Sequence, residues 1–240
     1  MIYAFSVVGG IIISIMGILI TRPLLKLMNT PDNIIDLSAT YLCIYFAGLV
    51  FVFIYNVGAG ILRAVGDSRR PLYFLILCCF INIVLDIILI VFLKMGVAGA
   101  AIATTFSQGI SAVMVTVTLC RTTDIFRLRV KKIRFHAQPM GMIVKIGLPA
   151  GLQSVMYSLS NVIIQSSLNT FGTETVAAWT AFSKIDAIYW MISGAFGIAI
   201  TTFVGQNYGA GKFGRMKKSV RVCLAMDIGA SILISAVLFF

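Results

Sequence analysis

The residues best suited to chemistry are Asn82 and Asp86, four positions apart in the middle of an apolar run. On a helix this spacing places both side chains on one face. An ionised carboxylate in hydrocarbon costs about 3 kcal/mol on insertion scales, so such residues usually mark ion pathways. A carboxylate beside an amide oxygen suits a proton or a hard cation such as Na⁺. The alternative is a neutral aspartic acid that makes an interhelical hydrogen bond.

Two further apolar runs carry polar side chains that could contribute to such a site. Thr104 and Ser107 could add hydroxyl oxygens, although helical threonine and serine often bond back to their own backbone. Tyr41 and Asn56 lie on approximately one face of an earlier run and could line a cavity. Tyr41 could equally be an aromatic anchor at the outer membrane interface, which is the commoner role.

A later apolar run carries polar residues at four-residue steps: Gln153, Tyr157, Asn161, Gln165 and Asn169. Because each step drifts by about 40° around a helix, this stripe winds slowly and cannot face lipid. It lines either a solvated substrate cavity or ordinary interhelical hydrogen bonds. Asp186, in the next run, is a further cavity candidate unless it lies in an outward extension of the helix. Asp227 is expected to snorkel or to pair with Arg221 in a structural role.

The sequence contains no motif typical of an enzyme. It has no P-loop, no nucleophile elbow, no H-E-x-x-H pair and no dinucleotide fingerprint. Its five cysteines lack metal-ligand spacing, and its single histidine, His136, lies in a basic loop. We therefore expect no catalytic residue and no cofactor other than a coupling ion. An ion gradient is the conventional energy source that remains.

The composition places these residues in a membrane. Hydrophobic residues make up 60% of the 240 positions and charged residues only 11%, whereas typical globular chains carry about 25% charge. A net charge of +11 on a soluble protein would suggest nucleic acid. Here the basic residues fall between apolar runs, so we expect lipid and a small organic molecule as partners, and no nucleic acid.

The apolar runs predict an all-α, polytopic bundle of about seven membrane helices. A spanning helix needs roughly 20 apolar residues, and the runs are too long and too uniformly apolar for barrel strands. The last run ends without a polar flank, from which we expect a truncated C-terminus. The predicted spans are 3–21, 38–62, 71–94, 97–120, 142–170, 176–205 and 218–240.

The linkers between these runs predict topology. The second, fourth and sixth linkers are the more basic, and the positive-inside rule places them in the cytoplasm at 63–70, 121–141 and 206–217. The protein is thus predicted to be a multi-pass protein of the plasma (inner) membrane. The longest and most basic linker, at 122–141, divides four helices in 1–121 from three in 142–240.

Several stretches, in order and spread over nearly the whole chain, resemble the multidrug and toxic compound extrusion (MATE) family. The resemblance implies a twelve-helix protein of two six-helix lobes, of which this chain would cover the third helix to part of the ninth. The missing helices would be partners of the chain. The stretches are Ile61–Pro71, Asn82–Asp86, Gly96–Thr104 with Ser107–Gln108, Gly147–Pro149 followed by the polar stripe, and Val204–Lys212.

The resemblance also implies a function and a site. The family exports organic, often cationic, compounds in exchange for Na⁺ or H⁺. By motif, Asp86 and Asn82 match its fifth-helix ion ligands and Thr104 its sixth-helix hydroxyl, so Na⁺ could bind at these three residues. Tyr41 and Asn56 fall where the family has further polar lining residues. The family also uses an acidic residue in its first helix, which this chain lacks.

Two rival functions remain open at this point. A flippase for a lipid-linked oligosaccharide, from the same wider superfamily, would predict a strongly cationic internal cavity, whereas most Lys and Arg here lie in linkers. A membrane fragment without transport activity would bind neither ions nor dye. An ion channel is a weaker third alternative.

Overall fold

The described residues of the computed structural model fold into seven long helices, which confirms the predicted all-α membrane bundle. These residues are 2–28, 30–122, 127–128 and 137–239, and the side chains of 137–140, 169 and 237–239 lie outside the description, as does His136. Each helix is long and apolar enough to cross a membrane. The helices are α1 (Ile2–Leu27), α2 (Asp32–Ala64), α3 (Arg69–Asp86), α4 (Gly96–Arg121), α5 (Ala137–Leu168), α6 (Thr173–Gly209) and α7 (Phe213–Phe239).

Most helices extend beyond the apolar runs that predict them. The run at 176–205 becomes α6, whose 37 residues correspond to about 55 Å of helix, against a hydrocarbon core of about 30 Å. The run at 38–62 becomes α2, which begins at Asp32 directly after Pro31. Helical hydrogen bonding therefore continues through polar flanks that hydropathy alone assigns to linkers. Likewise, α5 begins at Ala137, inside the predicted linker 122–141.

The third predicted span, 71–94, is confirmed as a membrane-spanning helix over Arg69–Phe92, but its last part is not a regular α-helix. The α-helix ends at Asp86 and continues as a π-helix, η1 (Ile87–Phe92). Lys94 and Gly96 then adopt φ of 53° and 55°, which lets the chain reverse tightly into α4. The result is an antiparallel α3–α4 hairpin whose turn directly follows the π-helix.

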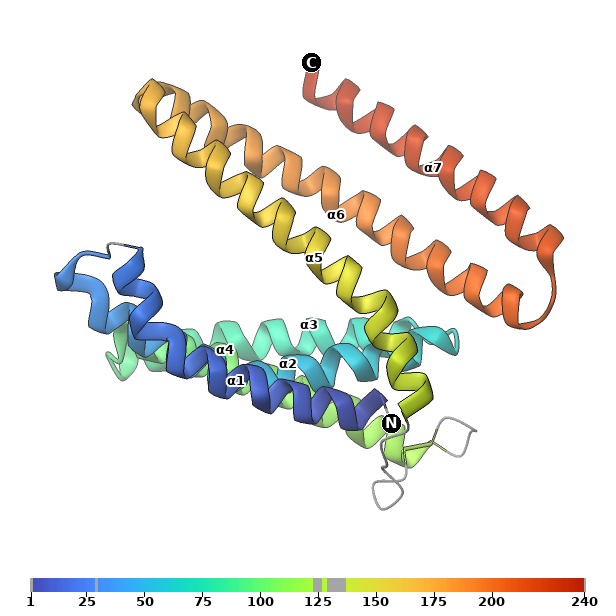
Figure 1. Cartoon of the computed structure of the whole chain (residues 1–240), viewed down its shortest axis with the longest axis horizontal. Helices are drawn as coiled ribbons and strands as arrows, with labels where there is room; N and C mark the ends of the chain where they lie inside the picture. Colours follow the sequence, from blue (N-terminus) through green and yellow to red (C-terminus); the bar gives the residue numbers. More distant parts are fainter. Residues whose placement is uncertain (1, 29, 123–126, 129–136, 240) are drawn as a thin grey trace. The chain divides into compact units, whose positions relative to one another are not determined.

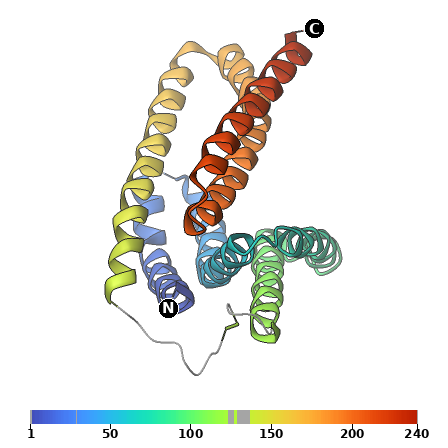
Figure 2. The ribbon, with the colours of Figure 1, turned by 90° about the vertical axis from the view of Figure 1, so that its right-hand side faces the viewer.

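The chain separates into two compact units, Met1–Met140 and Gly141–Phe240. In the first unit α2 packs against both α1 and α4, and α3 packs mainly against α4. Figure 1 shows these helices from blue to green, and Figure 2 shows α2, α3 and α4 more nearly end-on. The assignment of the units to two transporter lobes remains a prediction.

Small residues set the helix spacing in the first unit. A Cβ atom added to Gly48 would lie 2.6 Å from Thr105 Cγ2, and one added to Gly58 would lie 2.8 Å from Val115 Cγ1. Such close approach of backbones is the usual packing mode of membrane helices. Near these contacts, the fully buried side chains of Ala59, Leu62, Val115 and Leu119 form the core.

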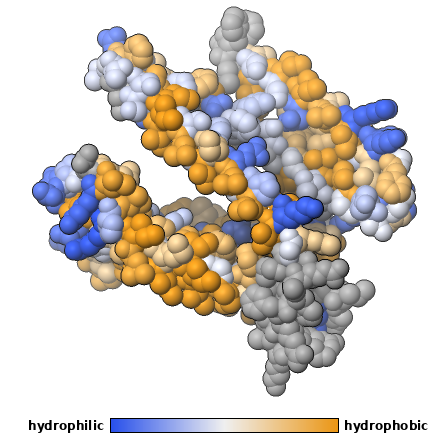
Figure 3. Space-filling model, in the orientation of Figure 1, coloured by the Kyte–Doolittle hydropathy of each residue, from blue (hydrophilic) through white to orange (hydrophobic). Residues whose placement is uncertain are grey.

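In the second unit α6 packs against α7. The α5 helix joins α6 through a short 3₁₀ helix, η3 (Asn169–Phe171), and Gly172 at φ 92°. Most side chains of this unit are exposed, as in Met191 at 75%. Figure 3 shows apolar residues in orange along the helices, with hydrophilic residues in blue at helix ends and in patches along the helices. Apolar surface of this extent requires lipid or further helices around it.

Candidate functional site

The α3 helix directs Asn82 and Asp86 into the protein. The buried residues Phe74 and Cys78 precede them at four-residue steps on the same helix face, and α3 packs mainly against α4. Asn82 Nδ2 and Asp86 Oδ1 are both buried, and neither has a hydrogen-bond partner among the described residues. Both polar groups therefore lie in the interior of the first unit, away from lipid.

The α3–α4 hairpin sets which α4 residues lie level with this pair. A Cβ atom on Gly99 would lie 3.2 Å from Leu89 Cβ near the turn. Farther from the turn, Phe74 and Val115 belong to one buried cluster. In an antiparallel pair with this register, Asp86 lies level with Ala103 and its neighbours. Small α4 side chains at this level leave room beside the carboxylate.

Asp86 is also the last residue of the regular α-helix. Ile87, the first residue of the π-helix η1, still directs its backbone N–H to the carbonyls of Ile83 and Val84. Short π-helical segments occur frequently at functional sites, because they change the direction of side chains and leave carbonyls less tightly bonded. No feature of the sequence predicts this irregularity, since the run from Ile87 to Phe92 is uniformly apolar, as in a regular helix.

Thr104 is half-buried on α4, and its hydroxyl donates a hydrogen bond to the Ala100 carbonyl at 3.0 Å. This is the backbone bonding expected of a helical threonine. Because the hydroxyl proton is used, the oxygen can act toward a ligand only as an acceptor. Such an oxygen suits a cation rather than an anion.

Tyr41 and Asn56, the other candidates in the first unit, make their described contacts within α2. Tyr41 is half-buried and stacks on Tyr45, with ring centroids 6.3 Å apart and planes at 7°. Asn56 is exposed, and its amide donates to the Val52 carbonyl at 2.9 Å. Neither contact joins these residues to Asp86, so their role as cavity lining stays a prediction.

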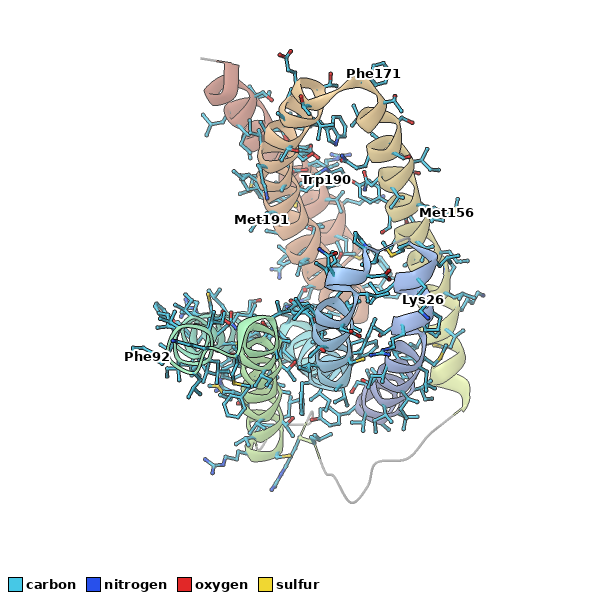
Figure 4. The ribbon with its side chains drawn as sticks, turned by 90° about the vertical axis from the view of Figure 1, so that its left-hand side faces the viewer. Lys26, Phe92, Met156, Phe171, Trp190 and Met191 are labelled. Atoms are coloured by element: carbon cyan, nitrogen blue, oxygen red, sulfur yellow. The ribbon has the colours of Figure 1, made fainter. Side chains whose placement is uncertain are left out.

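The candidates in the second unit lie on exposed surfaces of α5 and α6. Gln153, Tyr157, Asn161 and Gln165 are exposed, and Asp186 is half-buried; the side chain of Asn169 lies outside the described residues. The Tyr157 ring packs edge to face against Trp190, with centroids 6.4 Å apart. Figure 4 shows Trp190 on the side of α6 toward α5, whereas Met191 points away. The polar stripe therefore runs beside an aromatic pair.

Asp227 makes a contact that differs from the one expected. Ser193 Oγ of α6 donates to Asp227 Oδ2 of α7 at 3.3 Å, so the carboxylate bonds across the helix pair to Ser193 and not to Arg221. Ser193 lies near the middle of the long α6 helix. The sequence could not show this pairing, because it depends on which α6 residue lies opposite residue 227.

A tightly bound transition metal has no site in the described residues. In 2–28, 30–122, 127–128 and 137–239, no three His, Cys, Asp or Glu residues lie close enough to hold one. The first unit instead offers one carboxylate with neutral amide and hydroxyl oxygens. That donor set suits a proton or a monovalent hard cation that binds reversibly.

Comparisons with known proteins find relatives of this chain. The sequence model of the MatE family matches residues 1–88 and 149–240. The chain is 30% identical, over 98% of its length, to the probable multidrug resistance protein YoeA of Bacillus subtilis. It is 24% identical, over 99% of its length, to the multidrug export protein MepA of Staphylococcus aureus. The chain spans about half, 53%, of each relative.

A solved structure shows the same fold. The chain superimposes on the outward-facing conformation of a multidrug resistance MATE family transporter of the MOP superfamily with a TM-score of 0.84 and 26% identity. The match covers 98% of this chain and 52% of that transporter.

Proposed function

Because this chain belongs to the MatE family of multidrug efflux transporters, we propose that it forms part of a secondary antiporter that exports organic, often cationic, compounds in exchange for Na⁺ or H⁺. Members of this family are multi-pass membrane transporters and not enzymes. The chain spans about half the length of its curated relatives, so the activity is proposed for the complete gene product.

The observation that carries this proposal is the buried, unpartnered pair Asp86 Oδ1 and Asn82 Nδ2. A charged or polar atom buried without a partner is strongly unfavourable in a protein interior. The structural alternative, a neutral aspartic acid in an interhelical hydrogen bond, would give Oδ1 a partner in the first unit. A proton or cation from outside the chain supplies the interaction that Asp86 Oδ1 lacks and makes Asp86 the site of the coupling ion. Asn82 Nδ2 is a donor and needs an acceptor, such as the oxygen of a bound water molecule.

The coupling mechanism follows from this chemistry. The ion neutralises Asp86, and the Asn82 side-chain oxygen and the Thr104 hydroxyl oxygen supply neutral ligands if the ion is Na⁺. The transporter alternates between an inward-facing and an outward-facing conformation. An ion that binds one of these conformations more tightly than the other shifts the population toward it. Release of the ion to the side with the lower concentration then allows the return step, as in alternating access generally.

The substrate would bind at surfaces of the second unit. The exposed stripe on α5 offers amide and phenol groups, and Tyr157 and Trp190 offer aromatic faces and edges. Aromatic rings attract organic cations, with a gain of about 2 kcal/mol when the site is dehydrated. This combination favours cationic aromatic compounds as substrates, with Asp186 as an accessible counter-charge.

A flippase for lipid-linked sugars would need basic groups in its cavity. In the part of the chain that the structure describes, the buried polar residues are serines, a threonine and an asparagine, and no lysine or arginine is buried. This distribution argues against an anionic lipid substrate.

The direct test is Asp86→Asn in the complete gene product, reconstituted in vesicles with an imposed Na⁺ or pH gradient. Efflux of a fluorescent cationic dye should fall by about a hundredfold. The amide carries no negative charge, so neither H⁺ nor Na⁺ binds to it as it would to the carboxylate. Asp36→Asn is the matched control, since the Asp36 side chain is 80% exposed and its ion pair with Arg22 lies at the surface. Undiminished efflux in Asp86→Asn would refute the assigned role, and the gradient that drives wild-type efflux identifies the ion.

A further inference from the structure

Further polar side chains of the α3–α4 hairpin follow Asp86 toward one end of the first unit. On α3 the residues Phe74, Cys78, Asn82 and Asp86 follow one another at four-residue steps. On α4 the residues Ala103, Ser107, Ser111 and Val115 do the same in the opposite direction. Side chains at four-residue steps on two antiparallel helices form successive layers about 6 Å apart, and each step turns by about 40° around its helix.

The register of the hairpin pairs these layers. With Leu89 opposite Gly99 and Phe74 in one buried cluster with Val115, Asp86 lies level with Ala103 and Asn82 with Ser107. One layer farther from the turn, Cys78 lies level with Ser111. We call Asp86, Asn82, Ser107, Cys78 and Ser111 the polar column.

Ser111 is the unusual member of this column. Its side chain is fully buried, at 0% exposure, and its Oγ has no hydrogen-bond partner among the described residues. By contrast, Ser107 Oγ in the preceding turn donates to the Ala103 carbonyl at 2.8 Å, and Thr116 and Thr118 bond back in the same way. Buried hydroxyls are nearly always hydrogen-bonded to protein, water or an ion.

The polar column therefore contains three buried atoms in need of partners, on two helices: Asp86 Oδ1, Asn82 Nδ2 and Ser111 Oγ. A water molecule or hydrated ion with several polar neighbours satisfies such groups. Apolar residues close the next layer, where Phe74 and Val115 are buried together with Tyr55 and Leu62. Tyr55 also links α2 to the start of α3, because its hydroxyl donates to the Pro71 carbonyl at 3.0 Å.

We propose that the polar column is a hydrated path that gives the coupling cation a second position inward of Asp86, at Ser111, before the apolar layer around Phe74. This inference rests on the proposed ion coupling at Asp86 and adds a second binding position for the same ion. The ligand is a monovalent hard cation, either Na⁺ or a protonated water, held by oxygen atoms of Ser111 and Asn82. The charged arginines at the start of α3, Arg69 and Arg70, place the apolar layer toward the predicted cytoplasmic side.

A pair of variants with the same shape tests the role of the hydroxyl. Ser111→Thr and Ser111→Val in the complete gene product add the same volume, but only threonine keeps the oxygen. We expect dye efflux driven by a limiting ion gradient to be about tenfold slower in Ser111→Val than in Ser111→Thr, because a hydrogen bond to a charged group is lost. Dye binding to the purified protein should be equal in the two. Equal efflux rates would overturn the proposal.

Two controls keep the test decisive. If the added methyl group prevents folding, Ser111→Ala is compared with Ser14→Ala, since Ser14 Oγ of α1 is also buried without a described partner but lies outside the column. Only Ser111→Ala should slow efflux; equal effects overturn the proposal. Running each variant in a Na⁺ gradient and in a pH gradient separates the two candidate cations.

The native thiol in the column reports its hydration. With Cys43, Cys79, Cys120 and Cys223 replaced by alanine, Cys78 should react with a small, water-soluble methanethiosulfonate, and Ser111→Val should slow that reaction. An unreactive Cys78, in protein that still transports dye, would show a dry column and refute the path. The proposed function is tested by a different result. It predicts loss of efflux in Asp86→Asn whether or not Cys78 reacts.

Discussion

The α3–α4 hairpin of the first unit and the α5 helix of the second unit carry the same kind of polar pattern with different structural outcomes. In both, polar side chains recur every four residues. In the hairpin the polar atoms Asn82 Nδ2, Asp86 Oδ1 and Ser111 Oγ are buried and lack described partners. On α5 the residues Gln153, Tyr157 and Asn161 are exposed. A four-residue period thus identifies the face of a helix, while the neighbouring helix decides whether that face is covered.

The neighbouring residues explain the difference. In the first unit Gly10, Gly48 and Gly58 bring other helices so close that an added Cβ would lie within 3 Å of them. In the second unit the glycines of α5, such as Gly147 and Gly151, have no other atoms within 4 Å of that position. The first unit therefore builds a closed polar interior suited to an ion, and the second presents an open polar surface suited to a larger molecule.

The largest expected effect would break the close packing of the first unit. Gly58→Leu should lower stability by about 3 kcal/mol, because its Cβ would lie 2.8 Å from both Cγ atoms of the buried, β-branched Val115. Gly60→Leu, two residues along the same helix, should be nearly neutral, since no atom lies within 4 Å of its added Cβ. The midpoint of thermal unfolding in detergent measures both. Equal midpoints would mean that α2 and α4 do not approach as described.

A second pair of variants compares the two polar patterns directly. Asn82→Leu should weaken the apparent affinity for the coupling ion by about tenfold, because it removes a neutral ligand beside Asp86. Asn161→Leu should leave ion affinity unchanged and alter which dyes are exported. Efflux rates measured across ion concentrations and across a panel of dyes separate the two effects. A change in ion affinity in Asn161→Leu would contradict the division of roles between the units.

The sequence allowed prediction of the helices and of the inward face of α3, and physical reasons limit the rest. Hydropathy finds a span because lipid requires some 20 apolar residues, but it misses polar helix ends such as Asp32 at the start of α2. Four-residue spacing placed Asn82 and Asp86 on one face. The π-helix after Asp86 was not predictable, because its residues are as apolar as those of a regular helix. The partner of Asp227 depended on helix register, which no local pattern contains.

The smallest expected effect concerns the one described polar contact between side chains of α6 and α7. Ser193 donates to Asp227 Oδ2 at 3.3 Å, a length at the weak end of the normal range. In a membrane such a bond is worth only about 0.6 kcal/mol on average, because the separated helices also find partners. A double-mutant cycle of Ser193→Ala and Asp227→Ala, read from the thermal midpoint, isolates this term.

A coupling of that size would make the contact ordinary structural bonding, in contrast to the unpartnered carboxylate of Asp86. A coupling well above 2 kcal/mol would contradict this view, since only a charged and dehydrated Asp227 holds its donor so strongly. Dye efflux should distinguish the two carboxylates further. Asp227→Asn keeps an oxygen that can accept from Ser193, so it should retain most of the transport that Asp86→Asn loses. That result would support the proposed ion coupling in the first unit, where Asp86 Oδ1 is the one carboxylate oxygen that is buried without a partner among the described residues.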